Sequence, residues 1–510
     1  MADTKNKKDI IDIAKRRGFF WQSSLIHGGA AGFYDYAHLG TLLKQKWERQ
    51  WRRFFLGLDD NFYEISTSVI MPEDVFKASG HLKHFVDPVV KCSKCGSTER
   101  ADHILESELK ESFEGMTPEE LTGMIKKHNL KCPKCKGPLE STGVFNMLFP
   151  MDVGAGKDIQ KAYLTGETAQ GAYVNFKLEF EALRRRLPMG LAIIGKAFRN
   201  EIAPRNALIR MREFSQAELQ IFFDPDTITE HPRFKDVARY KLMLLPISNR
   251  KSGKVVEMAC ESVVSKLKLP MFYVYHMAKI QQFYINLLKL PKTKFRFRQL
   301  SDEEKAFYNK YHWDIELDLP SLGGWKECAG CHYRTDHDLK GHQEVSGEKM
   351  VVDVDGKKVL PHVLELSFGV DRNVYALFEL ALTEEKVKGE ERTILKFPRV
   401  VSPFDAGIFP LVNKDKLPKK AREIQDMLEQ AGYNIFYDGS GSIGRRYRRI
   451  DEIGVAAGIT IDYDSLKRQD VTLRDRDSMG QIRVKIKKLP DVLKEFLNGE
   501  KLGGLGKKVK

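Results

Sequence analysis

Two apolar segments that carry charged residues at alternate positions constrain the fold of this chain more than any other feature. The segment LAIIGKAFRNE ends with Arg199 and Glu201, and the segment REFSQAELQIFF carries Phe214, Gln216 and Glu218 at every second position. Alternation with a period of two predicts two β-strands joined by a polar loop. Residues two apart in a strand lie on the same face, so these side chains share one face of a hairpin. Because isolated charges are costly to bury, that face is either a salt-bridged surface or the wall of a cleft for a charged ligand.

A third predicted strand, HVLELSFG, adds Glu365 and Ser367 on one face, and the apolar helix VDRNVYALFELAL follows Gly369. Arg372 lies in the first turn of that helix, where backbone N–H groups and the helix dipole attract phosphate. An arginine at this place can add bidentate contacts to phosphate oxygens. Such an arginine alone is common, but beside the charged hairpin it favours a cleft that binds phosphate.

The composition limits the class of protein. The chain has 510 residues, of which 42% are hydrophobic and 30% charged, a balance typical of globular proteins with a large core and one or two appended domains. The first residues, MADTKNKKDI, are polar, and no segment approaches the roughly 18 apolar residues of a membrane span. We therefore expect a cytoplasmic protein that does not cross a membrane.

The formal net charge of +14 favours a polyanionic partner, because each Lys or Arg that neutralises a phosphate releases counterions. Charge alone does not distinguish a nucleic-acid partner from a basic surface.

Four of the seven cysteines form two C-x-x-C pairs, Cys92 with Cys95 and Cys132 with Cys135. Two such pairs are typical of structural zinc sites with four thiolate ligands. The segment between them is longer than the roughly 15–20 residues of a compact zinc ribbon, so it must form a small subdomain. We expect zinc rather than free thiols, and we expect Cys260 to be a core residue.

The order of patterns along the chain divides it into regions. An amphipathic helix begins at Leu39, and residues 88–143, which hold the two cysteine pairs, form an insertion. Residues 224–294 carry mixed helical patterns that predict no clear element. From residue 398 strands and helices alternate, which predicts a separate C-terminal α/β domain over 398–510.

Five separate blocks along the chain resemble segments of a known family. FRNEIAPRNALIRMREFSQAE and ELSFGVDR resemble motifs 2 and 3 of the class II aminoacyl-tRNA synthetases. TGETAQGAYVNF, ERADHILE and GWKECAGCHYRTDHDL narrow the similarity to glycyl-tRNA synthetases, from about residue 19 to 497. The resemblance implies an α+β fold, with an antiparallel catalytic sheet flanked by helices over residues 1–87 and 144–397. Motif 1 would lie in the first part, motifs 2 and 3 in the second, and the C-terminal domain would bind the anticodon.

The resemblance also implies ATP-dependent activation of glycine and its transfer to the 3′ end of tRNA(Gly). Arg199 would hold the ATP α-phosphate and Arg372 the γ-phosphate, both as catalytic residues, and Phe214 would stack on adenine. Glu327 would suit a Mg²⁺ ion on the phosphates. The implied ATP-binding set is Arg199, Asn200, Glu201, Ile209, Arg210, Met211, Arg212, Glu213, Phe214, Glu327, Cys328, Gly369, Val370, Asp371 and Arg372.

For glycine, the resemblance places Glu167, Glu218 and Glu365 around the ammonium group. Exclusion of alanine would be steric, so no editing domain is needed. The implied glycine-binding set is Arg100, Glu167, Phe214, Ser215, Gln216, Ala217, Glu218, Glu365, Leu366, Ser367, Phe368 and Gly369.

Two dipeptides depart from the family pattern. Thr165 and Gly166 replace an Arg-Pro before Glu167, which removes an arginine from beside the glutamates. Ala37 and His38 replace the Gly-Pro of motif 1, which forms the dimer interface in this class. We expect a homodimer whose packing differs from that of the family.

The C-terminal run GRRYRRID places Arg445, Arg446, Arg448 and Arg449 on one short helix around Tyr447. Phosphate contacts with aromatic stacking commonly hold single-stranded RNA, so these arginines are candidate tRNA ligands, although a solvated basic face would give the same pattern.

Two other functions stay open from the sequence. One is a class II synthetase for another amino acid, and the other is a catalytically inactive, synthetase-like accessory protein that only binds nucleic acid. Three carboxylates without a large side-chain pocket argue against the first. The presence together of Arg199, Glu201, Phe214 and Arg372 argues against the second.

Overall fold

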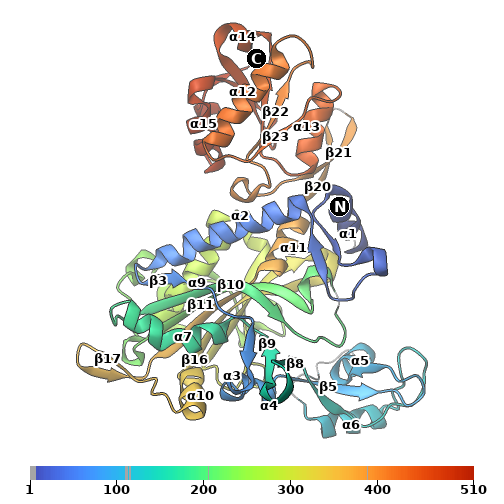
Figure 1. The fold of residues 1–510 in the computed structure, drawn as a ribbon, viewed down its shortest axis with the longest axis vertical. Helices are drawn as coiled ribbons and strands as arrows, with labels where there is room; N and C mark the ends of the chain where they lie inside the picture. The colour runs from blue at the N-terminus through green and yellow to red at the C-terminus, as the bar shows by residue number, and fades with distance from the viewer. Residues whose placement is uncertain (1–6, 110–112, 114–115, 205, 388, 510) are drawn as a thin grey trace.

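The computed structural model describes residues 7–109, 113, 116–204, 206–387 and 389–509. A large catalytic body lies below a smaller C-terminal domain, and the cysteine-containing insertion extends from the lower right of the body (Figure 1). Within these residues no helix is both long enough and apolar enough to cross a membrane.

A nine-stranded sheet, mostly antiparallel, forms the catalytic body. Only the pairs β12–β14 and β10–β3 are parallel. Its strands, in spatial order, are β13 (Val256–Ala259), β12 (Lys241–Leu245), β14 (Phe295–Gln299), β15 (Tyr311–Leu319), β16 (Gly324–Thr335), β19 (His362–Gly369), β11 (Glu213–Phe223), β10 (Met189–Phe198) and β3 (Phe62–Glu64).

The predicted hairpin is the centre of this sheet. β10 and β11 pair antiparallel from Met189↔Phe222 to Phe198↔Glu213, and β11 then pairs with β19. The alternation of β11 divides its side chains between two environments. Ala217, Leu219 and Ile221 enter the main hydrophobic core, whereas Gln216 and Glu218 face the opposite side. That polar side carries the site described below.

Helix α2 (His38–Phe55), predicted from Leu39 as an amphipathic surface helix, covers the apolar face of the sheet with α9 (Met271–Gln282) and α11 (Val370–Ala381). Trp47 and Trp51 of α2 contact the ring of Phe368 at centroid distances of 6.4 and 5.9 Å. Lys46 of α2 is buried and pairs with Asp405 of the C-terminal domain at 2.5 Å. The helix therefore lies between the two domains, as Figure 1 shows, and its apolar face is part of the core.

On the polar face, α7 (Ala169–Ala182) packs over β10 and β11, and α10 (His337–Ser346) lies beside it. These helices cover only part of that face, and the uncovered part forms the candidate site. The remaining helices of the body are α1 (Lys7–Arg17), α3 (Glu73–Ala78), α4 (His81–His84) and α8 (Cys260–Leu267).

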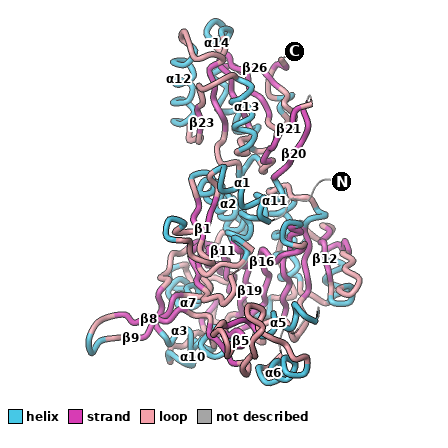
Figure 2. The backbone as a smooth tube through the Cα atoms, turned by 90° about the vertical axis from the view of Figure 1, so that its right-hand side faces the viewer, coloured by secondary structure: helices cyan, strands magenta, loops and turns pink. Residues whose placement is uncertain are grey.

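Short strand pairs complete the body: β1 (Phe20–Gln22) with β2 (Tyr34–Tyr36), β17 (Val352–Val354) with β18 (Lys357–Val359), and β4 (Ile70–Pro72) with β9 (Gln160–Leu164) and β8 (Phe149–Val153). The β8–β9 hairpin projects from the body as an arm (Figure 2). The hairpin of β20 (Leu382–Val387) and β21 (Glu390–Leu395) leads into the C-terminal domain.

Residues 224–294, where the sequence predicts no clear element, contribute β12, β13, α8 and α9. The two strands extend the catalytic sheet at its edge, and α9 is almost wholly buried beneath it. This region is therefore part of the catalytic body.

The insertion contains a three-stranded sheet, β6 (Thr98–Arg100), β5 (Val86–Lys91) and β7 (Gly143–Asn146), with helices α5 (Ala101–Leu109) and α6 (Pro118–Lys127). Residues such as Val90, Leu105 and Leu121 form a separate small hydrophobic core, which the sequence pattern does not reveal.

The C-terminal domain has a six-stranded mixed sheet covered by helices. Its elements, in chain order, are β22 (Ala406–Pro410), α12 (Leu417–Gln430), β23 (Ile435–Tyr437), α13 (Ile443–Glu452), β24 (Ala457–Ile461), α14 (Tyr463–Arg468), β25 (Asp470–Asp475), β26 (Gln481–Lys485), α15 (Leu489–Leu497) and β27 (Lys507–Lys508). Gly432 follows α12 with a positive φ of 89°, a conformation that favours glycine.

Candidate active site

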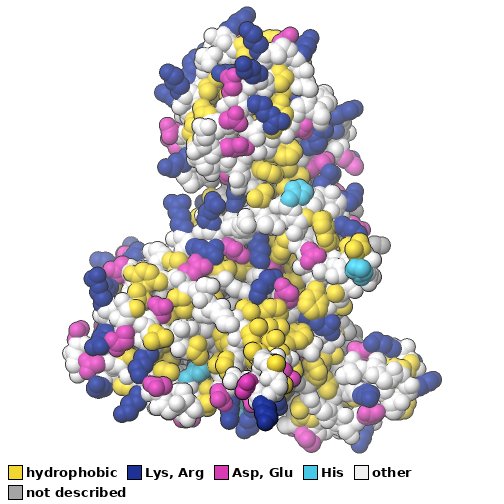
Figure 3. All heavy atoms as spheres, in the orientation of Figure 1, with side chains coloured by type: hydrophobic (Ala, Val, Ile, Leu, Met, Phe, Trp, Pro, Cys, Tyr) yellow, Lys and Arg dark blue, Asp and Glu magenta, His cyan; other side chains and the backbone are white. Residues whose placement is uncertain are grey.

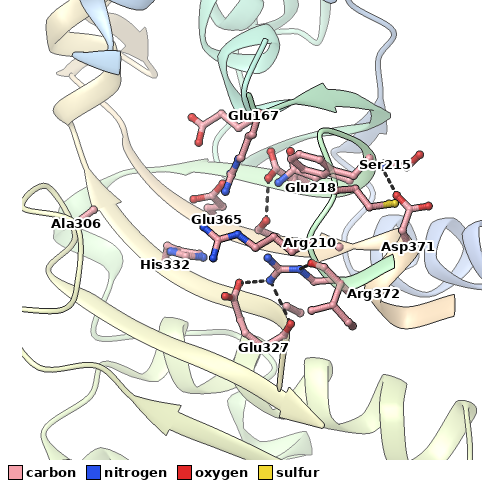
Figure 4. Close-up of a pocket in the computed structure, with 18 of the residues that line it drawn as sticks. Glu167, Arg210, Ser215, Glu218, Ala306, Glu327, His332, Glu365, Asp371 and Arg372 are labelled. Carbon is pink, nitrogen blue, oxygen red and sulfur yellow. Dashed lines mark hydrogen bonds and ion pairs between the residues drawn. The ribbon is translucent and has the colours of Figure 1, made fainter. Parts of the chain in front are cut away.

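A cavity of about 270 Å³ opens on the polar face of the sheet, against β11, β19 and β16. Glutamates from three elements gather at one end of it, and Arg372 with Glu327 lies at the other end (Figure 4). The strand alternation predicted from the sequence accounts for this wall, because Glu218, Ser367 and Glu365 come from neighbouring strands with their side chains on one face.

Glu218 lies at the centre of the acidic end and is nearly inaccessible to solvent. Its carboxylate accepts hydrogen bonds from Thr168 Oγ1 at 2.7 Å and from Ser367 Oγ at 2.8 Å. Burial, followed by the charges of Glu365 and Glu167, raises the pKa of Glu218 to about 8. Without a ligand this carboxyl group is therefore mostly protonated at neutral pH, and a cation entering the cavity would favour its ionised form.

Arg334, from the end of β16, organises the other acidic groups. Its guanidinium donates to Glu365 Oε2 at 3.0 Å and to both carboxylate oxygens of Asp338 at 2.8 and 3.0 Å. It also approaches Glu167 Oε1 at 3.5 Å. Asp338, Glu365 and Glu167 thus share one buried arginine, and Glu218 lies beside them.

The pKa values of Glu167 and Glu365 shift in opposite directions in this arrangement. Burial would raise the pKa of Glu167, but Arg334 and His81 lower it well below its usual value. The pKa of Glu365 is raised by burial, although Arg334 opposes that effect. The acidic end therefore holds one carboxyl group whose pKa is lowered, Glu167, and two whose pKa is raised, Glu218 and Glu365.

Two arginines, Arg199 and Arg372, also line the cavity. The Arg199 guanidinium lies between two aromatic rings, 5.2 Å from the centroid of Phe85 and 5.3 Å from that of Phe214. Its Nε donates to the Gly166 carbonyl at 3.1 Å, so the group is fixed in place while its terminal nitrogens stay available to a ligand. A guanidinium held in this way suits a phosphate group.

Arg372, in the first turn of α11, is fixed by different partners. It donates to the carbonyl oxygens of Ile209 at 3.0 Å and Glu327 at 3.1 Å, and its Nη1 lies 2.9 Å from the Glu327 carboxylate. The position at a helix start matches the expectation from the sequence, and the adjacent carboxylate could hold a cation bound to phosphate.

Most of the residues expected at the site line this cavity. From the ATP-binding set these are Arg199, Glu201, Ile209, Arg210, Met211, Phe214, Glu327, Gly369, Asp371 and Arg372. From the glycine-binding set they are Glu167, Phe214, Ser215, Gln216, Glu218, Glu365, Ser367 and Gly369.

Several expected residues do not line the cavity. Ala217, Leu366, Phe368, Val370 and Cys328 belong to the hydrophobic core on the other face, because they are out of phase with the polar residues beside them. Asn200, Arg212 and Glu213 are also absent from the cavity lining, and Glu213 pairs with Lys196 at 2.9 Å. The side chains of these eight residues do not line the cavity, and their contact with ATP or glycine stays a prediction.

Arg100 also lies outside the cavity lining. Its guanidinium donates to Asp87 at 2.7 Å and pairs with Asp102, which fixes it within the insertion. The direct contact of Arg100 with glycine stays a prediction, which these ion pairs do not support. Its charge still acts at a distance, because Glu201 and Arg100 influence each other electrostatically.

Ten lining residues are absent from the sequence-based set: His81, Phe85, Leu208, Ala306, Tyr308, Asn309, His312, Ala329, His332 and Arg334. A signal existed for two of them. His332 and Arg334 alternate within GWKECAGCHYRTDHDL in the same way as Glu365 and Ser367 do in their own strand. Ala329 also lies in β16, His81 in α4 and His312 in β15, and the rest lie in loops or a short turn of helix; local patterns do not indicate these eight.

The four cysteines of the insertion lie together, with all four Sγ atoms within 4.8 Å of one another. Cys92 and Cys135 are 3.5 Å apart, and Cys95 and Cys132 are 3.7 Å apart. Thiolates at about 2.3 Å from a tetrahedral zinc ion would be separated by roughly 3.8 Å, so this geometry fits zinc. Gly137 lies against the cluster, where a Cβ would stand 3.1 Å from two of the sulfurs.

Helix α13 divides its arginines between two environments. Arg445 and Arg448 are exposed, whereas Arg446 is 2% exposed and donates to the carbonyls of Pro410, Gly439, Ser440 and Gly441. The expected RNA contact of Arg446 is therefore corrected to a structural role.

The two other aromatic and basic side chains of this helix also make internal contacts. Arg449 pairs with Asp438 at 2.5 Å. Tyr447 is largely buried, with its hydroxyl 2.5 Å from Thr460 Oγ1, so stacking of this ring on a base is corrected too. Figure 3 shows basic side chains spread over the visible face of the C-terminal domain rather than gathered in one patch.

Two protein families match separate parts of the chain. The tRNA synthetase class II core domain (G, H, P, S and T) matches residues 160–381, from β9 to the end of α11, and the anticodon binding domain matches residues 405–496. The first match contains the cavity, and the second contains α13.

Curated relatives match nearly the whole chain. The glycine–tRNA ligase of Pyrococcus horikoshii is 40% identical, over 96% of this chain and 98% of the relative. That of Thermococcus gammatolerans is 38% identical, over 98% and 100%. That of Methanococcus vannielii is 35% identical, over 96% and 99%.

Proposed function

This chain belongs to the glycine–tRNA ligase family of class II aminoacyl-tRNA synthetases, and we propose how its cavity performs the reaction of that family. The enzyme activates glycine with ATP to form glycyl-adenylate and pyrophosphate, and it then transfers glycine to the 3′ end of tRNA(Gly). The comparisons give no support to a synthetase for another amino acid or to an inactive accessory protein.

The acidic end of the cavity carries the proposal for glycine. The ammonium group would lie among Glu218, Glu365 and Glu167, and Ser367 would stand beside it. Arg334 is engaged with Asp338, Glu365 and Glu167, so it orients these carboxylates. A methyl group on the α-carbon would meet the crowded side chains there, so alanine is excluded by shape.

The part of the cavity lined by the two arginines would bind ATP. Phe214, whose ring faces the Arg199 guanidinium, would stack on adenine, and Arg199 would hold the α-phosphate where glycine attacks. Arg372 would bind the γ-phosphate. The carboxylate of Glu327 suits Mg²⁺, which when bound neutralises phosphate charge. In this arrangement the two ends place the glycine carboxylate against the α-phosphate.

Amino-acid-dependent exchange of pyrophosphate into ATP tests this function. Glycine should support rapid exchange, and alanine, serine and proline should support almost none. Exchange with alanine or serine at the rate seen with glycine would contradict the proposed pocket.

We also propose that Cys92, Cys95, Cys132 and Cys135 hold one structural zinc ion. The arrangement of their sulfurs supports this, and a zinc ion there would tie β5 and β6 to the segment after α6. Purified protein should contain about one zinc per chain, and Cys132→Ser should abolish it. Cys260→Ser, at a buried core cysteine outside the cluster, is the matched control. Absence of zinc from protein purified without chelator would refute the site.

The C-terminal domain would bind tRNA(Gly) through the exposed face of α13, which carries Arg445 and Arg448, with Arg449 at its edge. The homodimer and the cytoplasmic location suggested by the sequence, and the domain boundaries, stay predictions. Gel filtration with light scattering would measure the oligomeric state directly.

A further inference from the structure

A pair of histidines forms a part of the cavity wall that no role described above uses. His312 of β15 and His332 of β16 stand opposite each other in the strand register, with ring centroids 4.0 Å apart. Asn309, from the loop before β15, is buried beside them. All three line the cavity, and Figure 4 shows His332 on the wall between Glu365 and Glu327.

The contacts of these residues indicate which nitrogen of each ring carries a proton. The side-chain amide nitrogen of Asn309 lies 3.5 Å from His312 Nδ1 and 3.4 Å from His332 Nδ1. With the amide in this orientation, its N–H₂ group donates to both Nδ1 atoms, which places the proton of each ring on Nε2. The Nε2 of His312 lies 3.0 Å from Asp314 Oδ1, an ion-pair distance without hydrogen-bond geometry.

The Nε2 of His332 lies beside Gly330. Gly330, two residues earlier on the same face, has no side chain, and a Cβ there would collide with His332 Nε2. Gly330 pairs with Ser367 of β19. The imidazole thus extends along the sheet to the level of Ser367, whose hydroxyl donates to Glu218. Among the described residues no hydrogen-bond partner is recorded for this nitrogen.

The environment also keeps the ring neutral. Burial, followed by the nearby His312 and Arg334, lowers the pKa of His332 well below its usual value. Glu167 opposes this effect only in part. A neutral imidazole with its proton on Nε2 is a fixed hydrogen-bond donor that does not act as a base at neutral pH.

We propose that His332 donates its Nε2–H to the carbonyl oxygen of the glycyl group and is a catalytic residue for the transfer step. This inference rests on the proposed function, because it places the ammonium group among the glutamates. The carboxyl carbon then lies near Ser367, within reach of His332. Asn309 is the positioning residue, since its amide holds the ring in the required tautomer.

In the transfer step, a terminal ribose hydroxyl oxygen of the tRNA forms a bond to the carbonyl carbon of glycyl-adenylate. The electron pair of the C=O bond moves to the oxygen, which His332 Nε2–H stabilises. The C=O bond then reforms, the bond from carbon to the phosphate oxygen breaks, and AMP leaves with the hydroxyl proton on its phosphate. His332 keeps its proton throughout, so its contribution is that of an oxyanion-hole donor.

The kinetic test compares three substitutions of His332 in the full-length protein. Gln places an amide N–H₂ near the position of Nε2, Asn places one near Nδ1, and Ala removes the donor. His332→Ala and His332→Asn should slow single-turnover transfer from preformed glycyl-adenylate to tRNA(Gly) about 100-fold. They should also raise the KM for glycine in pyrophosphate exchange roughly tenfold, because a hydrogen bond to the carboxylate is lost. His332→Gln should retain most of the transfer rate.

The matched control is His362→Gln, in β19, whose ring bonds to the Tyr333 hydroxyl at 2.6 Å outside the cavity lining. It should change neither quantity. Transfer within twofold of wild type in His332→Ala would overturn the proposal, and so would a defect in His332→Gln as large as in His332→Ala. Failure of the proposed function would appear differently, as loss of glycine-dependent exchange in the wild-type protein itself.

The tautomer offers a readout that a merely structural role would not change. In protein labelled with ¹⁵N-histidine, the resonance that disappears in His332→Gln should be that of a neutral ring with its proton on Nε2. Asn309→Leu should lower the fraction of His332 rings that carry the proton on Nε2. It should slow transfer less than His332→Ala does. A protonated ring, or a proton on Nδ1, in the wild type would refute the assignment.

Discussion

The sequence indicates two charge clusters as ligand sites, the glutamates of the catalytic sheet and the arginines of α13. In the structure the glutamates face one cavity, whereas the arginines lie in different environments. Glu218 and Glu365 come from adjacent strands and face one cavity. On α13, Arg446 donates hydrogen bonds to backbone carbonyls of its own domain, whereas Arg445 is exposed. A period of two keeps alternate residues on one face, whereas consecutive residues on a helix point about 100° apart. A run of like charges on a helix therefore mixes ligand-facing and structural residues.

The largest effect should come from Arg334→Ala, which leaves Glu167, Glu365 and Asp338 without their shared cation. Removing one partner of a buried ion-pair network costs about 3–5 kcal/mol of unfolding free energy. Glycine-dependent exchange should be lost as well. Urea unfolding and pyrophosphate exchange measure both effects. Arg186→Ala, at an exposed arginine paired with Asp60, is the control and should be near neutral. Wild-type stability in Arg334→Ala would mean that the acidic end needs no countercharge.

Arg199→Ala should affect the rate without a comparable loss of stability, because this guanidinium makes one backbone hydrogen bond and two aromatic contacts. Loss of one donor to the transition state lowers the rate by about 10²–10³-fold. Glycine activation is measured by pyrophosphate exchange and folding by thermal unfolding. An activation rate near that of the wild type would remove Arg199 from its assigned role.

A matched pair on α13 tests the contrast between buried and exposed arginines. Arg446→Ala should lower the unfolding free energy of the C-terminal domain by about 2–3 kcal/mol, since several buried carbonyls lose their charged donor. Arg445→Ala should leave that free energy unchanged within about 0.5 kcal/mol. Limited proteolysis and denaturant unfolding monitor the domain. Equal destabilisation by both substitutions would show that the two arginines do not differ in role.

The protonation of Glu218 predicts a pH dependence. Its pKa of about 8 in the empty cavity means that the carboxyl binds a proton at pH 7, and an arriving ammonium group must displace that proton. The KM for glycine should therefore fall about tenfold per pH unit as pH rises towards 8, and it should level off above that value. Initial rates of exchange between about pH 6 and 9 measure this. Glu218→Gln should abolish the slope, and an unchanged slope in that variant would assign the titration to another group.

The smallest effect should come from the exposed face of α13. The double substitution Arg445→Ala and Arg448→Ala should weaken tRNA(Gly) binding several-fold. The slope of the logarithm of the binding constant against the logarithm of salt concentration should become smaller, by the amount expected for about two phosphate contacts. Pyrophosphate exchange without tRNA should stay unchanged. Equal loss of both activities would indicate a role in the fold.

The alternation of polar and apolar residues predicts the central strands and the cavity wall that they build. β10, β11 and β19 lie where the sequence indicates them, and α11 begins directly after Gly369. The resemblance adds the identity of the class, which the relatives confirm. The opposite wall, with Tyr308, Asn309 and His312, is not indicated by any local pattern, because a loop and a strand distant in sequence carry it.

The sequence by itself determined the strands, the faces on which charges lie and the family, because backbone geometry fixes the period of a strand or helix locally. Only the tertiary structure decided the partners. Arg334 is the cation beside Glu167, and Arg100 is fixed by Asp87 and Asp102 outside the cavity lining. Pairing across strands depends on register and on what covers each face. Those are set by long-range packing, in which an unpaired buried charge is too costly to persist.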